Sequence, residues 1–277
     1  MHSKHLYARR VGAVFDPLMP LFYLRGLTGK TRTVGANRHL GLALTFVAGA
    51  TNAGGFLAVN QYTSHMTGIV SSMADDLALG NIALALAGLG GLLSFIGGAA
   101  CSAILFNWAS RKHLHSKYAL SLLLEALLLL CFGLLGAHLS LQMGLFVPVT
   151  VMLLCFIMGL QNAIITKISK AEIRTTHVTG LVTDLGIELG KLFYWNSRQN
   201  NPGIPAVMAN RERLGLLIGL LTMFFAGGVV GALGFKHIGF MSTAPLAALL
   251  LLMAVVPVLD DVMMRLRRLK KQLRSQT

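Results

Sequence analysis

Charged residues are scarce in this sequence, and acidic residues are the scarcest among them. Of the 277 residues only 12% are charged, and Asp and Glu together number 10. A soluble globular domain carries about 25% charged residues, which keep its surface in contact with water. A chain with so little charge cannot cover a water-facing outside. An ordinary soluble fold is therefore excluded, and lipid must cover much of the surface.

Cysteine is also rare, and the common sequence patterns of catalytic and metal sites are missing. Cys101, Cys131 and Cys155 stand inside apolar stretches without metal-ligand spacing, so we expect them to be small buried hydrophobic residues. The chain has no Walker loop, no His-Glu-x-x-His motif and no Gly-x-Ser-x-Gly elbow. The sequence therefore predicts neither a metal site nor a cofactor.

Apolar residues are abundant instead, and they gather in long stretches. Hydrophobic residues make up 55% of the chain, and the mean hydropathy is +0.67. This length leaves room for about six spans of roughly 20 residues, which is the length that crosses a bilayer as a helix. We predict an all-α, polytopic membrane bundle with spans at residues 40–62, 82–108, 118–139, 145–168, 214–235 and 240–259.

The basic residues, which give a formal net charge of +14, follow the order of these spans. They are frequent before the first span, in the second and fourth connections, and after the last span. The first and third connections contain none, and the fifth contains only Lys236. This alternation agrees with the positive-inside rule for both termini in the cytoplasm. Because topology accounts for the charge, we predict no nucleic-acid partner.

The chain accordingly divides into three parts. Residues 1–39 form a basic cytoplasmic segment, residues 40–259 the six-span transmembrane domain, and residues 260–277 a basic cytoplasmic tail. Residues 263–274 are expected to continue the last helix beyond the bilayer. Their charge either only orients the protein or also holds anionic lipid headgroups.

Two sequence motifs occur twice, in the same order. Residues 46–53, Phe-Val-Ala-Gly-Ala-Thr-Asn-Ala, resemble residues 156–163, Phe-Ile-Met-Gly-Leu-Gln-Asn-Ala, at an offset of 110 residues. Residues 63–68, Thr-Ser-His-Met-Thr-Gly, resemble residues 175–180, Thr-Thr-His-Val-Thr-Gly, at an offset of 112 residues. The chain is thus predicted to contain two repeats, at about 40–139 and 145–259. Since each has three spans, the copies are inverted in the membrane, as in many secondary transporters.

Each Thr-x-His-x-Thr-Gly motif begins a stretch too short to cross the bilayer comfortably. Thr and Gly suit a helix start, so we predict two short helices, interrupted or re-entrant, one on each side of the membrane. On the first helix, His65 and Asp76 share a face, and on the second, His177, Asp184 and Glu188 do so. Each copy therefore presents a His near its start and a carboxylate about three turns later.

This arrangement predicts a site for a small polar or anionic substrate between the two motif copies. Free N–H groups at a helix start, hydroxyls and a nearby His favour such a ligand, although the same residues can simply cap helices. The candidate substrate-binding residues are Asn52, His65, Thr67, Gln161, Asn162, Thr175, His177 and Thr179. His and buried carboxylates can also carry a proton. The proton-coupling candidates are Asp75, Asp76, Asp184, Glu188 and Glu125, the last of which lies inside the third span.

The same motifs resemble a known family. Gly49-Ala-Thr-Asn-Ala53 with Thr63-Ser-His-Met-Thr-Gly68, and their counterparts at 159–163 and 175–180, look like those of the YoaK family of bacterial membrane proteins. The resemblance extends over roughly residues 40–259. It implies a six-span protein of the bacterial inner membrane, and it implies no substrate, because the family has no established function.

Three functions remain open at this point. The leading hypothesis is a secondary transporter of a small molecule or ion, with or without a coupled proton, which could work as a homodimer. One alternative is a membrane enzyme that acts on a lipid-like substrate through His65, His177 and the carboxylates. The other is a non-catalytic partner or sensor subunit, whose function would tolerate substitution of these residues.

Overall fold

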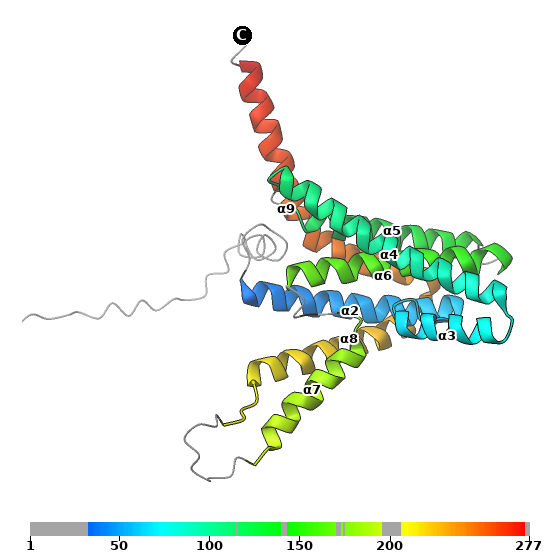
Figure 1. The fold of residues 1–277 in the computed structure, drawn as a ribbon. Helices are drawn as coiled ribbons and strands as arrows, with labels where there is room; N and C mark the ends of the chain where they lie inside the picture. The colour runs from blue at the N-terminus through cyan, green and yellow to red at the C-terminus, as the bar shows by residue number, and fades with distance from the viewer. Residues whose placement is uncertain are drawn as a thin grey trace, which may run out of the picture.

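The computed structural model describes residues 33–114, 116–139, 143–169, 173, 175–195 and 206–274. Most of the predicted segment 1–39 and the end of the predicted tail lie outside this part. Within it, every regular element is helical, which confirms the predicted fold class. In the labels of Figure 1, the elements are α2 (Val34–Val59), α3 (Met66–Ala78), α4 (Ile82–Arg111), α5 (Ala119–Leu139), α6 (Met143–Ile168), α7 (Val178–Phe193), α8 (Arg211–Ile238), η1 (Gly239–Ser242) and α9 (Thr243–Arg274).

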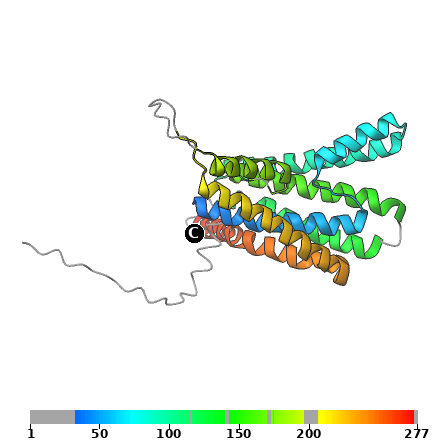
Figure 2. The same ribbon diagram turned by 90° about the horizontal axis from the view of Figure 1, so that it is seen from below.

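Long apolar helices make up the body of the molecule. Five stretches of the described chain are long and apolar enough to cross a membrane, and the fifth, Arg211–Arg267, contains α8 and most of α9. The helices α2, α4, α5, α6, α8 and α9 therefore match the six predicted spans. Successive long helices run in opposite directions, and the two ends of the described chain lie at the same end of the bundle (Figures 1 and 2). The protein is thus a helical membrane protein.

Local backbone geometry explains where the first span differs from its prediction. The helix α2 begins at Val34 rather than at the predicted residue 40, because the Thr33 hydroxyl accepts a hydrogen bond from the Ala36 N–H at 3.1 Å. Asn60 ends the helix at φ 55°, and Asn is one of the few residues that adopt this left-handed conformation readily. Hydropathy shows neither feature, since both depend on single polar residues at the helix ends.

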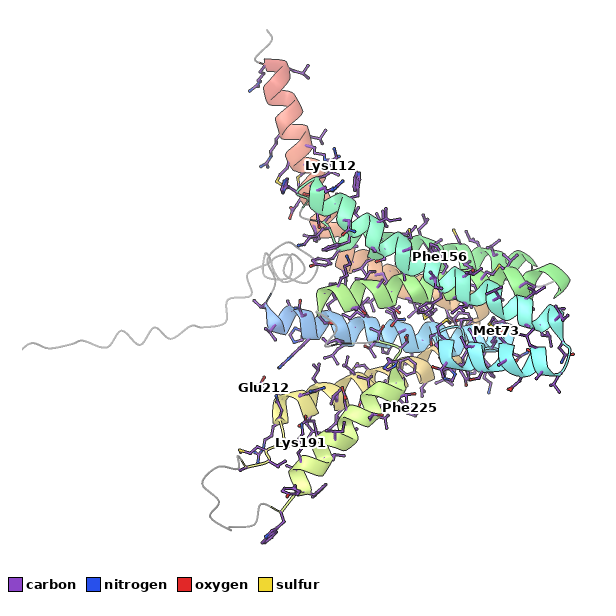
Figure 3. The ribbon with its side chains drawn as sticks, in the orientation of Figure 1. Met73, Lys112, Phe156, Lys191, Glu212 and Phe225 are labelled. Carbon is purple, nitrogen blue, oxygen red and sulfur yellow. The ribbon has the colours of Figure 1, made fainter. Side chains whose placement is uncertain are left out.

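The two short helices occupy opposite ends of the bundle. The 13-residue helix α3 packs against α4, and the 16-residue helix α7 packs against α8. Figure 3 shows Met73 of α3 at one end and Lys191 of α7 at the other. The sequence prediction of two short helices after the repeated motifs is therefore confirmed.

The long helices of the two halves pack against each other, with α2 on α8 and α6 on α4. At the crossing of α2 and α8, a Cβ atom on Gly49 would collide with the carbonyl oxygen of Phe224. A Cβ atom on Gly227 would in turn collide with the carbonyl oxygen of Phe46. Only glycine allows backbones to approach this closely within a membrane bundle.

The crossing of α4 and α6 repeats this pattern residue for residue. Here Gly159 faces the carbonyl oxygen of Phe95, and Gly98 faces that of Phe156. Gly159 and Phe156 are the counterparts of Gly49 and Phe46 in the repeated motif. Each half thus inserts its first long helix into the other half, and the halves interlock. The sequence repeat had not predicted this exchanged pairing.

Candidate functional site

Each repeated Thr-x-His-x-Thr-Gly motif places a His directly before its short helix. His65 is the N-cap residue of α3 and His177 that of α7, and neither side chain makes a capping hydrogen bond. Thr and Gly stand in the first turn of each helix, as the sequence predicted, whereas the histidines at the N-cap positions had not been predicted. The two glycines of the motif, Gly68 and Gly180, have another use. A Cβ atom on either would collide with the imidazole of the preceding His, so each ring folds over the first turn of its helix.

The repeated asparagines hold the motifs in place. The Oδ1 atom of Asn52 on α2 accepts a hydrogen bond from the Ser64 hydroxyl at 2.8 Å. The Oδ1 atom of Asn162 on α6 accepts one from the Thr176 hydroxyl at 2.9 Å and a longer one from Thr175 at 3.5 Å. Ser64 and Thr176 are counterparts at the 112-residue offset. Both amides, and buried Thr175, therefore link a long helix to the residues just before a short one.

A cavity of about 600 Å³, which we call the α3 pocket, lies beside the first short helix. His65, Ile69, Ser72 and Asp76 line it, and these are the residues of the predicted face of α3. The opposite walls come from the first turns of α4 and α6, including Gly88 and Pro148. The pocket therefore combines one imidazole and one carboxylate with a largely apolar wall.

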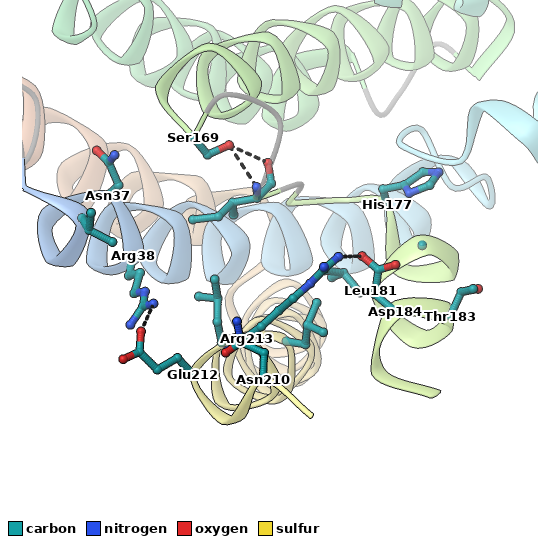
Figure 4. Close-up of a pocket in the computed structure, with 15 residues that line it drawn as sticks. Asn37, Arg38, Ser169, His177, Leu181, Thr183, Asp184, Asn210, Glu212 and Arg213 are labelled. Atoms are coloured by element: carbon teal, nitrogen blue, oxygen red, sulfur yellow. Dashed lines mark hydrogen bonds and ion pairs between the residues drawn. The ribbon is translucent and has the colours of Figure 1, made fainter. Parts of the chain in front are cut away.

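A second cavity of about 780 Å³, the α7 pocket, lies at the other end of the bundle. His177 and Asp184 of α7 line it together with Arg38 at the start of α2 and Glu212 and Arg213 at the start of α8 (Figure 4). Arg213 pairs with Asp184 at 3.0 Å, and Arg38 pairs with Glu212 at 2.9 Å. This pocket is thus more highly charged than the α3 pocket.

The two pockets are built from corresponding pieces of the two halves. In each, the walls are a short helix, the start of the long helix that follows it, and the start of the first long helix of one half. At the repeat offset of 112 residues, Ser72 corresponds to Asp184, and Asp76 corresponds to Glu188. The structure does not bring His65 and His177 together, because their pockets lie at opposite ends.

Glu188 continues the pocket-lining face of α7 but is buried against α8. Its carboxylate accepts hydrogen bonds from Lys191 Nζ at 2.9 Å and from the Asn210 backbone N–H at 2.8 Å. The hydrogen bond from Lys191 is the main cause that lowers the pKa of this carboxyl, and the Asn210 N–H lowers it further. Asn210 is also the N-cap of α8. Glu188 therefore fastens the two helices together in its charged form.

The remaining predicted residues lie away from both pockets. Thr67, Thr179 and Asp75 are exposed and line neither cavity. Buried Gln161 donates its amide hydrogen to the Leu44 carbonyl oxygen at 3.0 Å, which joins α6 to α2. Glu125 is fully buried in α5, and neither carboxyl oxygen has a hydrogen-bond partner among the described residues.

Sequence reasoning missed the charged wall of the α7 pocket. Arg38 and Arg213 had been interpreted only as topology signals, and Glu212 and Asn210 had not been noticed. The sequence signal was an acidic residue between two basic ones directly before a span, at residues 211–213. Among the described residues, no group of three or more His, Cys, Asp or Glu side chains could hold a metal ion.

The comparisons with known proteins agree with this description of the fold and add no activity. Neither a curated protein nor a solved structure matches the chain. One family profile, described as "Protein of unknown function (DUF1275)", matches residues 40–256, which reach from the second turn of α2 into α9 and include both repeated motifs. The YoaK-type resemblance of the motifs is consistent with this match. Because the match extends over most of the sequence, the chain belongs to the DUF1275 family of proteins of unknown function.

Proposed function

We propose that the protein is a secondary transporter of a small polar or anionic substrate, with its termini in the cytoplasm of a bacterial cell. One observation carries the proposal, namely that equivalent pockets lie at opposite ends of one membrane bundle. A protein that works by alternating access needs a route to its substrate from each side. In this proposal the α3 pocket opens to the outside and the α7 pocket to the cytoplasm.

The organisation of the halves supports this mechanism. The proposed inverted repeats pair α2 with α8 and α4 with α6, so glycine-lined crossings of the same kind occur twice. In transporters with inverted repeats, two conformations of similar energy arise when the halves exchange their arrangements. Here the exchange would close one pocket while it opens the other. Close backbone contact at the crossings suits a rocking motion, because it leaves few side chains to repack.

The polar groups of the pockets supply the proposed coupling chemistry. Each pocket has a His, a side chain whose ring nitrogens can both donate and accept a proton. A carboxylate stands close along the same helix face, Asp76 in the α3 pocket and Asp184 in the α7 pocket. Glu125 is a further candidate, because its carboxyl is buried inside the membrane domain and has no hydrogen-bond partner among the described residues.

No observation favours the alternative of a membrane enzyme. A catalytic cluster gathers its groups at one depth, whereas His65 and His177 stand in pockets at opposite ends. The third function is that of a partner or sensor subunit. Substituting these histidines distinguishes it from transport, because a partner or sensor subunit would tolerate the change and a transporter would not.

The test is solute and proton movement in sealed proteoliposomes. A pH-sensitive dye is trapped inside, a panel of anions, amino acids and sugars is added outside, and uptake of labelled forms of each is measured in parallel. The variant His65→Ala/His177→Ala is compared with His237→Ala, because His237 is exposed on α8 and lines neither pocket. We expect uptake of one solute class that is lost in the double variant and kept in the control.

The outcomes separate the hypotheses. Uptake accompanied by a pH change indicates proton coupling, and Glu125→Gln then tests whether the buried carboxyl takes part. Uptake without a pH change supports transport without a coupled proton. Transport of these solute classes is wrong if both assays stay silent for the wild-type protein, or if the double variant transports as well as the control.

A further inference from the structure

The last helix extends well beyond the end of its span. α9 runs from Thr243 to Arg274 and contains Pro257. A proline inside a helix removes one backbone hydrogen bond and kinks the helix. Figure 1 shows the last part of α9, in red, leaving the bundle axis and projecting sideways away from one end of the bundle. A helix with this course lies in the plane of the membrane interface if the bundle spans the bilayer.

An apolar stripe continues from the span into this terminal segment, residues 259–274. Leu252 in the span is 55% exposed, and Leu259, Val262, Leu266 and Leu273 are 50%, 47%, 52% and 66% exposed. Successive members of this series are seven, three, four and seven residues apart, and these spacings keep them on one side of the helix. In the span, this side faces lipid. The stripe therefore gives the terminal segment an apolar face that the bundle does not cover.

The rest of the terminal segment is strongly basic. Residues 263–274 include no acidic residue and six basic ones, namely Arg265, Arg267, Arg268, Lys270, Lys271 and Arg274. A helix with an apolar stripe and a basic remainder is typical of proteins that lie in a membrane interface. Anionic lipids attract such a segment, and each basic residue near the surface adds to the attraction.

A side-chain contact fixes the start of the segment to the bundle. The carboxylate of Asp261 is buried and accepts hydrogen bonds from the Ser116 backbone N–H at 2.8 Å and from its hydroxyl at 2.7 Å. Ser116 lies three residues before the start of α5, which packs along α9. The contact holds the segment at the end of the bundle where α4 ends and α5 begins, which is the level at which the two helices leave the bilayer.

We infer that the terminal segment binds the anionic surface of the bilayer that surrounds the bundle, with its apolar stripe in the lipid and its basic residues on the headgroups. This inference does not depend on transport. Lipid fits the segment better than a second copy of the chain. The stripe has heptad spacing, but in a parallel pair Arg265 of one copy would meet Lys270 of the other, and the like charges would repel.

The experiment compares two adjacent positions on opposite sides of the segment. Full-length protein without its native cysteines receives one cysteine, either Leu266→Cys on the stripe or Arg267→Cys on the basic side, and an environment-sensitive fluorophore. It is reconstituted into vesicles of phosphatidylcholine with or without phosphatidylglycerol. Quenching by a neutral aqueous quencher and by lipids spin-labelled near the headgroup is measured for each position.

With phosphatidylglycerol present, we expect the label at 266 to be quenched by lipid and shielded from water, and the label at 267 to show the reverse. The contrast should weaken without the anionic lipid and when all six basic residues are Gln. It should also weaken in about 1 M NaCl, where the Debye length falls to about 3 Å. If the basic residues only orient the protein in the membrane, the labels at 266 and 267 should be equally exposed to water in every lipid.

Three results would overturn the inference. One is equal aqueous quenching at 266 and 267 in vesicles that contain phosphatidylglycerol. A second is energy transfer between labels at 266 on two copies, independent of lipid charge, which would indicate self-association. The third is exposure to water in defined vesicles but protection in native membranes, which would indicate an acidic protein partner.

Discussion

At the residue scale, glycine sets how closely the two halves approach each other. At Gly98 and Gly227 the absent Cβ leaves room for a backbone carbonyl oxygen of the facing helix, at Phe156 and Phe46 respectively. A carbonyl oxygen belongs to the main chain, so it cannot turn away as a side chain would. Helix spacing at both crossings therefore depends on these positions, although glycine itself lowers helix propensity.

We predict that Gly98→Ala and Gly227→Ala each destabilise the protein in detergent by about 1–3 kcal/mol, the usual cost of overpacking. Gly215→Ala on α8 is the matched control, because a Cβ atom there has no neighbour within 4 Å. The control should be neutral or slightly stabilising, as alanine favours a helix by about 1 kcal/mol over glycine. The stability difference is measured by heating each variant and determining the fraction that stays folded by size-exclusion chromatography. Equal stability of the three variants would mean that the crossings are looser than described.

At the element scale, Glu188 decides how firmly α7 stays against α8. Its carboxylate joins Lys191 of α7 to the N-cap residue of α8, and these bonds lower its pKa. A carboxyl whose pKa falls on folding stabilises the folded arrangement at every pH above its ordinary value, which is about 4.3. The contribution disappears as the pH falls below this value and through the lowered pKa. It is therefore complete at neutral pH.

We predict that Glu188→Gln loosens α7 at neutral pH. Amide hydrogen exchange of residues 178–193, corrected for the intrinsic effect of pH, should be faster in the variant than in the wild type. The difference should begin to shrink as the pH falls below about 4.3 and should vanish below the lowered pKa, where the wild-type carboxyl is also neutral. Asp76→Asn is the control, since the only hydrogen bond described for the Asp76 side chain is a 3.5 Å contact with Ser72 in its own helix. If α7 and α3 respond equally, Glu188 has no special role in docking.

Much of this fold could be predicted because membrane helices leave strong local signals in sequence. Hydropathy located the long helices, and the repeated motifs located the short ones and the shared face of His65 and Asp76. The exchanged pairing of the halves could not be predicted. Periodicity identifies a partner helix only when one side of a helix is apolar and the other polar. In a membrane bundle nearly every side of a helix is apolar, so the sequence of α2 does not show that its partner is α8.

The candidate site was harder to predict for a related reason. Residue type alone made Asn52, Asn162 and Glu188 candidates for substrate or proton binding, but each has a structural hydrogen bond to another segment. Partners far apart in sequence decide whether a polar side chain is available to a ligand. Arg38 shows the converse, because a residue that satisfies the positive-inside rule also lines the α7 pocket.

At the scale of the whole molecule, the two pockets are described here in one arrangement of the chain. If they are alternately accessible, a state that holds one open must close the other. Coupling of this kind between two sites usually amounts to about 1–3 kcal/mol, or about 5–150-fold in an equilibrium constant. Reactivity of single cysteines can measure it without knowledge of the substrate. Ser72 and Thr183 suit the purpose, because each is exposed and lines one pocket.

We predict that a bulky thiol adduct on Ser72→Cys, in the α3 pocket, lowers the reaction rate of Thr183→Cys, in the α7 pocket, at least about fivefold. The native cysteines are replaced first. The same adduct on Met241→Cys is the control, because Met241 is 75% exposed in η1 and lines neither pocket. In intact cells, a membrane-impermeant reagent should reach Ser72→Cys but not Thr183→Cys if the α7 pocket faces the cytoplasm. Unchanged reactivity of Thr183→Cys would mean that the pockets are independent, and a rocking exchange of the halves would then no longer account for them.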